Sequence, residues 1–168
     1  MGKIRFKSKV TVYVLVIKDD AILMLRRSKT GIGDGEFAIP MGGVEQNETL
    51  IEAAIREVRE EVGLQIDPQN LEFTHVMYRL NSEDRGINPE DWMAENADFY
   101  FICREFEGEP YNAEPHKHDI VSFYPINDFP TPLVKHVKIA LDHILNKDTF
   151  SQYGWHLRNS AEKIENLS

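Results

Sequence analysis

Residues 42–64 read GGVEQNETLIEAAIREVREEVGL, and this stretch predicts a loop followed by a helix. Asn47 belongs to the residue types that favour a helix N-terminus, and Gly63 suits the position just past a helix C-terminus. Apolar residues recur between them at the spacing of a core-facing helical stripe: Ile51, Ile55, Val58 and Val62. We therefore expect one amphipathic helix between Asn47 and Gly63.

Three glutamates near the end of this helix are the main functional signal. Successive helical residues are about 100° apart, so Glu57, Glu60 and Glu61 fall within roughly 100° of one another on one face. Like charges at this spacing repel, and a hard divalent cation such as Mg²⁺ relieves the repulsion by binding carboxylate oxygens. The alternative is a solvated acidic face, which is the commoner explanation for an isolated E-x-x-E-E. The glycines that precede this helix favour the metal site.

Composition and charge indicate a small enzyme. The chain has 168 residues, with 19 Lys plus Arg against 28 Asp plus Glu, for a formal net charge of −9. This balance argues against a surface that binds nucleic acid polymers. The single cysteine, Cys103, cannot form an intrachain disulfide, and its apolar neighbours indicate a buried small side chain rather than a nucleophile.

Targeting signals are not evident in the sequence. The apolar run Val10–Ile17 is short, ends in charged residues and is followed by no small-residue cleavage site. No stretch approaches the roughly 18 apolar residues of a membrane span. We expect a cytoplasmic protein with no membrane partner, formed by a single domain over residues 1–168. Its tail, from about residue 150, would pack on the domain or extend from it.

Strand and helix patterns alternate along the chain. Val10–Ile17 and Ala21–Arg27 read as two strands of a hairpin, because the charged residues between them form a turn signal. Further strands are expected at 36–40, 71–80, 98–106 and 122–126, a second helix at 133–145, and a last helical turn or two in the tail. Strands interleaved with two helices predict an α/β fold with a mixed sheet flanked by helices.

Several residues of this stretch together match the pattern of a known family. The residues in question are Gly42, Glu48, Arg56-Glu57-Val58, Glu60-Glu61 and Gly63-Leu64, and together they resemble the Nudix box. A chance match to such fixed identities is on the order of one in 10⁸ per start position. Flanking segments, including Ile22–Arg27 and Phe106–Pro130, extend the resemblance to about two thirds of the chain. Met41 departs from the common glycine at its position.

The resemblance implies an α/β/α sandwich and a hydrolase. Nudix enzymes cleave a nucleoside diphosphate linked to another group, with Mg²⁺ or alternatively Mn²⁺ as the cofactor. The residues that it assigns to the metal are Glu57, Glu60, Glu61 and Gly42. It also assigns Arg56 to orienting the carboxylates, Gly43 and Met41 to the substrate, and Glu48 and Gly63 to the structure of the motif. Glu114 lies where related enzymes supply a further metal ligand or base, with a plain surface carboxylate as the alternative. Arg27 lies where related enzymes contact phosphate, with a salt bridge at a strand end as the alternative. The choice of general base among the glutamates stays open, because clustered carboxylates titrate as a coupled set.

The preferred reaction converts a (deoxy)nucleoside triphosphate, including oxidised forms, to the monophosphate and pyrophosphate. Nucleotide-sugars and dinucleoside polyphosphates are the alternative substrates, and capped RNA is disfavoured because no basic, aromatic-rich strip is visible. A catalytically silent nucleotide-binding module is the alternative from another class. The three retained glutamates argue against it. The sequence leaves the oligomeric state open, with a homodimer as one option.

Some further side chains carry weaker signals. His116 and His118 flank Lys117, but two histidines with no partner cluster are more often exposed loop residues, so we do not expect a zinc site. Trp92 and Phe37 could stack on a base, although simple packing is the commoner role of such residues.

Overall fold

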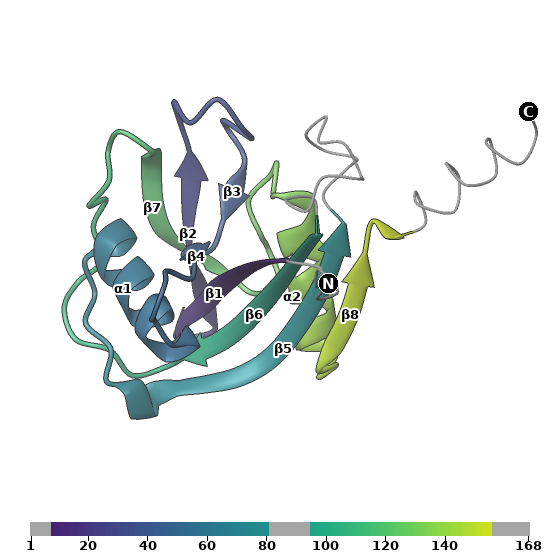
Figure 1. Cartoon of the computed structure of the whole chain (residues 1–168). Helices are drawn as coiled ribbons and strands as arrows, with labels where there is room; N and C mark the ends of the chain where they lie inside the picture. The colour runs from purple at the N-terminus through teal and green to yellow at the C-terminus, as the bar shows by residue number, and fades with distance from the viewer. Residues whose placement is uncertain (1–7, 81–94, 156–168) are drawn as a thin grey trace, which may run out of the picture.

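The computed structural model describes residues 8–80 and 95–155 (Figure 1). Its strands are β1 (Lys9–Lys18), β2 (Ala21–Arg27), β3 (Phe37–Ala38), β4 (Met41–Gly43), β5 (Leu71–Leu80), β6 (Glu95–Cys103), β7 (His118–Pro125) and β8 (Phe150–Tyr153). Two α-helices, α1 (Leu50–Val62) and α2 (Lys135–Leu145), and a short 3₁₀ helix, η1 (Pro68–Asn70), complete the described part of the chain. No helix within it is long and apolar enough to cross a membrane.

The first two strands form the expected hairpin. Asp19 and Asp20 have φ values of 49° and 58°, which is the left-handed conformation that a two-residue type I′ turn requires at both central positions. β1 and β2 pair only beside this turn, at Ile17–Ile22 and Lys18–Ala21, and then diverge. The hairpin therefore joins two groups of strands, with β2 carrying β3 and β7 and β1 carrying β4 and β6.

The sheet is mixed. β1 pairs parallel with β6 and β5 pairs parallel with β8, whereas the other pairings are antiparallel. Its main path runs β3-β2-β1-β6-β5-β8. In Figure 1, α1 lies beside β1 and β4, and α2 lies behind β5 and β8. The predicted mixed sheet flanked by helices is confirmed.

The helix α1 begins two residues later than expected. Thr49, not Asn47, is the N-cap, because its side chain accepts a hydrogen bond from the Glu52 amide while the Glu52 carboxylate accepts one from the Thr49 amide. This reciprocal pair satisfies two of the amides that a helix start leaves unpaired. At the other end Gly63 has φ 73°, the left-handed C-cap conformation that the sequence indicated.

Other element boundaries differ from the sequence expectations. The single strand expected at 36–40 is replaced by two short strands, β3 and β4, so that Met41–Gly43 becomes an edge of the sheet. The tail begins with a strand, β8, that was not predicted, and the rest of it, where a helical turn or two was expected, lies outside the described residues from residue 156 on. The expected second helix begins at Lys135, and Leu133 lies before it. Trp92 lies outside the described residues.

The core is mainly apolar, and it contains a buried ion pair. Arg79 on β5 and Asp98 on β6 are 5% and 0% exposed, and their side chains are in direct hydrogen-bonding contact. Cys103 is fully buried, as expected for a small apolar side chain. Phe37 is also buried, with its ring edge-on to Tyr124, so it packs in the core instead of offering a face to a base.

Breaking the buried pair should strongly destabilise the fold. In Asp98→Ala the guanidinium of Arg79 stays buried without its partner, and we expect a loss of about 3–5 kcal/mol in the free energy of unfolding. Asp119→Ala removes the partner of Arg26 in a comparable pair at the surface. Its free energy of unfolding should fall by only a small fraction of the loss in Asp98→Ala. Urea denaturation of both variants measures the difference, and equal losses would contradict the assignment.

Candidate active site

The site is built where α1 crosses β4. A Cβ atom placed on Gly42 would lie 2.0 Å from the Glu57 carboxyl carbon, so the Glu57 carboxylate occupies the space that any larger residue would fill. Glu57 is partly buried, and desolvation raises its pKa despite the neighbouring Arg56. Glycine is thus required at residue 42 because the helix brings a carboxylate directly against the strand backbone.

Arg56 holds the carboxylates and the loop in one network. Its Nε and Nη2 donate to the two oxygens of Glu48, at 2.7 and 2.9 Å. Its Nη1 donates to Glu57 at 2.6 Å and, more weakly, to Glu60 at 3.4 Å, while Nη2 also donates to the Gly43 carbonyl at 2.9 Å. The bidentate pair lowers the pKa of Glu48 to about 2. Glu48 therefore fixes Arg56, and Arg56 fixes Glu57 against the β4 backbone.

Glu61 is the buried member of the three glutamates. It is 7% exposed, and the Met41 amide donates to its Oε2 at 2.9 Å. Desolvation, reinforced by the charges of Glu57 and Glu114, raises the Glu61 pKa well above its usual value of 4.5. The sequence predicted that all three glutamates share one helix face, with Ile51, Ile55, Val58 and Val62 forming the core-facing stripe. In the structure Glu61 instead lies among the buried residues of α1, while Ile51 and Ile55 are only half-buried.

The loop after β6 brings a fourth carboxylate to Glu61. The amides of Tyr111 and Ala113 donate to the Val62 and Glu61 carbonyls, which are end groups of α1 that the helix itself leaves unpaired. The Tyr111 ring also covers Gly63 so closely that a Cβ atom there would lie 2.1 Å from Cε1. This docking places the next residue of the loop, Glu114, beside Glu61.

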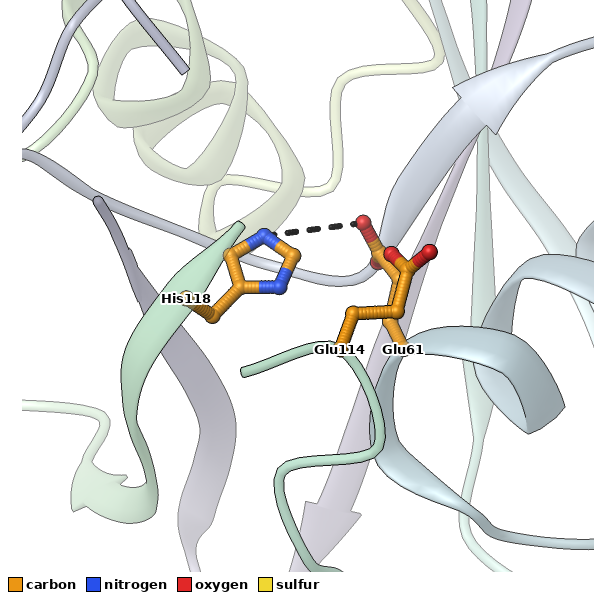
Figure 2. Close-up of side chains that lie close together, drawn as sticks. All are labelled: Glu61, Glu114 and His118. Atoms are coloured by element: carbon orange, nitrogen blue, oxygen red, sulfur yellow. Dashed lines mark ion pairs between the residues drawn. The ribbon is translucent and has the colours of Figure 1, made fainter. Parts of the chain in front are cut away.

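His118 completes the cluster, and its predicted surroundings were wrong. It was expected to be an exposed loop residue, as His116 is, but it is 3% exposed, and its Nε2 lies 3.8 Å from Glu61 Oε1 (Figure 2). Burial lowers the pKa of His118 to about 4, so the imidazole is neutral at physiological pH. One ligand atom from each of Glu61, Glu114 and His118 lies within 4.8 Å of the others.

Lys117 neutralises part of this cluster. Its Nζ donates to Glu114 Oε1 at 2.7 Å, and Glu114 and the more distant Glu61 and Glu57 together raise the Lys117 pKa. A positive charge among these carboxylates is what a bound cation would supply, and the exposed lysine side chain is free to leave when one binds.

The three residues predicted to contact substrate line one cavity of about 170 Å³ next to the carboxylates. Met41 and Gly43 form its β4 side, and Arg27 lies at the end of β2, where its Nε donates to the Ile32 carbonyl. The remaining lining residues are Lys9, Thr11, Tyr13, Arg79, Asn96, Val134 and His136. Arg79 is paired with Asp98, so Lys9 and Arg27 supply the positive charge of this cavity. In a protein of net charge −9, such a lining suits an anionic ligand.

The sequence analysis missed several of the cavity residues. Tyr13 and His136 are far apart in the chain, yet the Tyr13 hydroxyl and His136 Nε2 are 3.0 Å apart in the buried interior. Arg79 did carry a signal, because a charged residue interrupts the apolar positions of a strand. A larger hollow of about 460 Å³ lies around Gln65 and Ile66, but its acidic lining, which includes Glu105 and Glu107, would repel a polyphosphate.

The burial of Glu61 has a pH-dependent consequence for the metal-free protein. Because its folded-state pKa is raised, the contribution of Glu61 to stability is fully present below pH 4.5, the usual carboxyl value, and is lost as pH rises through the folded-state pKa. Glu61→Gln removes the charge, so the variant should be more stable than the wild type at pH 8 by about 1–3 kcal/mol. Thermal unfolding with EDTA from pH 4 to 8 measures the gap, which should widen with pH.

Glu60→Gln is the matched control, because Glu60 is exposed on the same helix. Its stability should follow the wild-type pH profile. A Glu61→Gln profile parallel to the wild type would contradict the raised pKa.

Comparisons with known proteins agree with this geometry. A family model described as NUDIX domain matches residues 7–144. The human protein 8-oxo-dGDP phosphatase NUDT18 is 29% identical over 138 residues, which are 79% of this chain and 38% of that protein. The chain thus spans well under half the length of this relative. The ADP-ribose pyrophosphatase of Methanocaldococcus jannaschii is 31% identical over 135 residues, 80% of this chain and 72% of that protein.

A solved structure shows the same fold. The MutT NUDIX hydrolase from Burkholderia pseudomallei superposes with a TM-score of 0.70 at 24% identity, covering 81% of this chain and 97% of that chain. The predicted fold and the resemblance read from residues 42–64 are both confirmed.

Proposed function

The chain belongs to the NUDIX family, and on that premise we propose that it is a metal-dependent hydrolase of nucleotide phosphoanhydrides. The preferred substrate is a (deoxy)nucleoside triphosphate, which would give the monophosphate and pyrophosphate. The observation that supports this most directly is the cluster of Glu61 and Glu114, with Glu57 close enough to raise the Glu61 pKa, beside a cavity bordered by cationic side chains. Carboxylates suit a metal, and the cavity suits the anion on which that metal acts.

The residues fit a divalent cation. Gly42 leaves the space that brings the Glu57 carboxylate to the β4 backbone, and Glu61 sits buried among negative charges that raise its pKa. Both features cost free energy in the metal-free protein, and a cation would offset that cost. Glu57, Glu60 and Glu61, with Glu114, would hold Mg²⁺ or Mn²⁺. When bound, such an ion neutralises phosphate charge and lowers the pKa of water.

The protein's own residues would position the reactants. Phosphoanhydride cleavage needs charge stabilisation and an aligned water more than a covalent nucleophile. Arg56, fixed by Glu48, keeps Glu57 in one orientation through a 2.6 Å hydrogen bond. Glu60 is the most exposed of Glu57, Glu60 and Glu61, and its contact with Arg56 is long, at 3.4 Å. Its side chain is therefore the least restrained and can move as the bound phosphate changes during the reaction.

Part of the nucleotide would lie in the cavity beside the carboxylates. Arg27 and Lys9, which line the cavity, would favour phosphate oxygens. A relative named as an 8-oxo-dGDP phosphatase supports a nucleotide with an oxidised base. A relative named as an ADP-ribose pyrophosphatase favours the second candidate, a nucleotide-sugar.

The carboxylate site can be tested with Glu57→Gln. This change keeps the side-chain volume but weakens both metal binding and the hydrogen bond from Arg56, so kcat should fall by at least about 100-fold. Glu72→Gln, at an exposed position of β5 outside the site, is the control and should retain full activity.

The assay should follow monophosphate and pyrophosphate separately over canonical and oxidised triphosphates, ADP-ribose, nucleotide-sugars and dinucleoside polyphosphates, each with Mg²⁺. Unchanged hydrolysis by Glu57→Gln would contradict the metal-site proposal. Hydrolysis of ADP-ribose or nucleotide-sugars without pyrophosphate release from any triphosphate would replace the preferred substrate with the second candidate.

The cavity can be tested at two neighbouring arginines. Arg27 lines the cavity, whereas Arg26 points to the other side of β2 and pairs with Asp119. Arg27→Ala should raise KM about tenfold with a smaller change in kcat, because it removes binding that is equal in the ground and transition states. Arg26→Ala should leave KM unchanged. Equal effects of the two changes would argue against nucleotide binding in this cavity.

A further inference from the structure

His118 carries an imidazole whose burial the fold does not explain. The side chain is 3% exposed, and its Nδ1 has no hydrogen-bond partner among the described residues. A buried polar atom without a partner costs about 1–3 kcal/mol, and buried groups of this kind in native proteins usually serve a ligand, an ion or catalysis. Apolar packing alone would be served better by leucine or phenylalanine at this position.

The pairing of β7 with β2 orients this imidazole toward two carboxylates. His118 opens β7 opposite Arg27 of β2, and the pairing register shifts between Arg26 and Arg27. Such a bulge re-aims a side chain, and here it directs His118 inward, while the next residue, Asp119, pairs with Arg26 at the surface. In Figure 2 the ring edge that bears both nitrogens faces the carboxylates of Glu61 and Glu114.

We propose that His118 donates an imidazole nitrogen to a divalent metal held between Glu61 and Glu114, making this subsite selective for first-row transition ions over Mg²⁺. Mg²⁺ prefers oxygen ligands, and an imidazole nitrogen favours ions such as Co²⁺. The proposal rests on the proposed function, because Glu61 is a ligand in the metal site of both. The glutamates of α1 and the imidazole of β7 would then give the site a mixed oxygen and nitrogen donor set.

The neighbouring groups are compatible with this role. Asn112 Nδ2 donates to the His118 carbonyl at 2.7 Å, and the His118 amide donates to the Glu114 carbonyl at 3.0 Å, so the backbone on both sides of the proposed ligands is fixed. Lys117, which contacts Glu114 at 2.7 Å, is half-exposed and can swing into solvent when a cation takes its place. A preformed ligand pair of this kind loses little conformational freedom on binding.

Co²⁺ binding to the whole chain tests the proposal without substrate. Co²⁺ is titrated into wild type, His118→Phe and the control His116→Phe, with visible absorption as the readout, and Mg²⁺ is titrated separately by calorimetry. His118→Phe should weaken Co²⁺ binding at least about tenfold and change the spectrum, while Mg²⁺ affinity changes less than about twofold. His116 is exposed, so His116→Phe should bind both ions like the wild type. Circular dichroism verifies folding, and His118→Asn replaces His118→Phe if that variant unfolds.

The result separates this inference from the proposed function. Unchanged Co²⁺ affinity and spectrum in a folded His118 variant would overturn the imidazole ligand, and Mg²⁺-dependent hydrolysis would survive that result. Co²⁺ binding that depends on His118, in a protein that hydrolyses no nucleotide with any metal, would support the subsite and overturn the hydrolase.

Discussion

The architecture of the site depends on burying the charge of Glu61. A carboxylate that is 7% exposed and close to two other carboxylates is unfavourable by itself, and the Met41 amide offsets only part of this cost. The fold must therefore hold α1 firmly against β4 to keep Glu61 in place. Docking of the Tyr111–Ala113 backbone onto the end of α1 does so, and it also delivers Glu114 to the same point.

Arg56 contributes the second half of the arrangement. It joins Glu48 on the loop, Glu57 on the helix and the Gly43 carbonyl on the strand through short hydrogen bonds. The site therefore pairs a rigid carboxylate, Glu57, with a looser one, Glu60, along one helix face. This combination suits a reaction in which charge on the phosphate must be stabilised while the leaving group departs.

The sequence predicted the fold and the helix that carries the glutamates, because residues 42–64 combine helix periodicity, a C-cap glycine and a family pattern. Local rules failed where long-range contacts decide. The start of α1 is a different case, because the cap was readable locally: of the two candidates, only Thr49 has a glutamate three residues later to close the capping box. The burial of His118 depends on a bulge between strands far apart in the chain, which no local pattern shows. Pairing with β5 makes a strand of Phe150–Tyr153.

The carboxylate cluster is unfavourable in the metal-free protein, and a bound cation would offset this cost. Because the Glu61 pKa is raised, metal binding should displace a proton from the folded protein. Calorimetric titration with Mn²⁺ at about pH 6, in two buffers of different ionisation enthalpy, measures this proton release directly. We predict Mn²⁺ binding with net proton release that disappears in Glu61→Gln. Binding without proton release, or release unaffected by this substitution, would contradict the account.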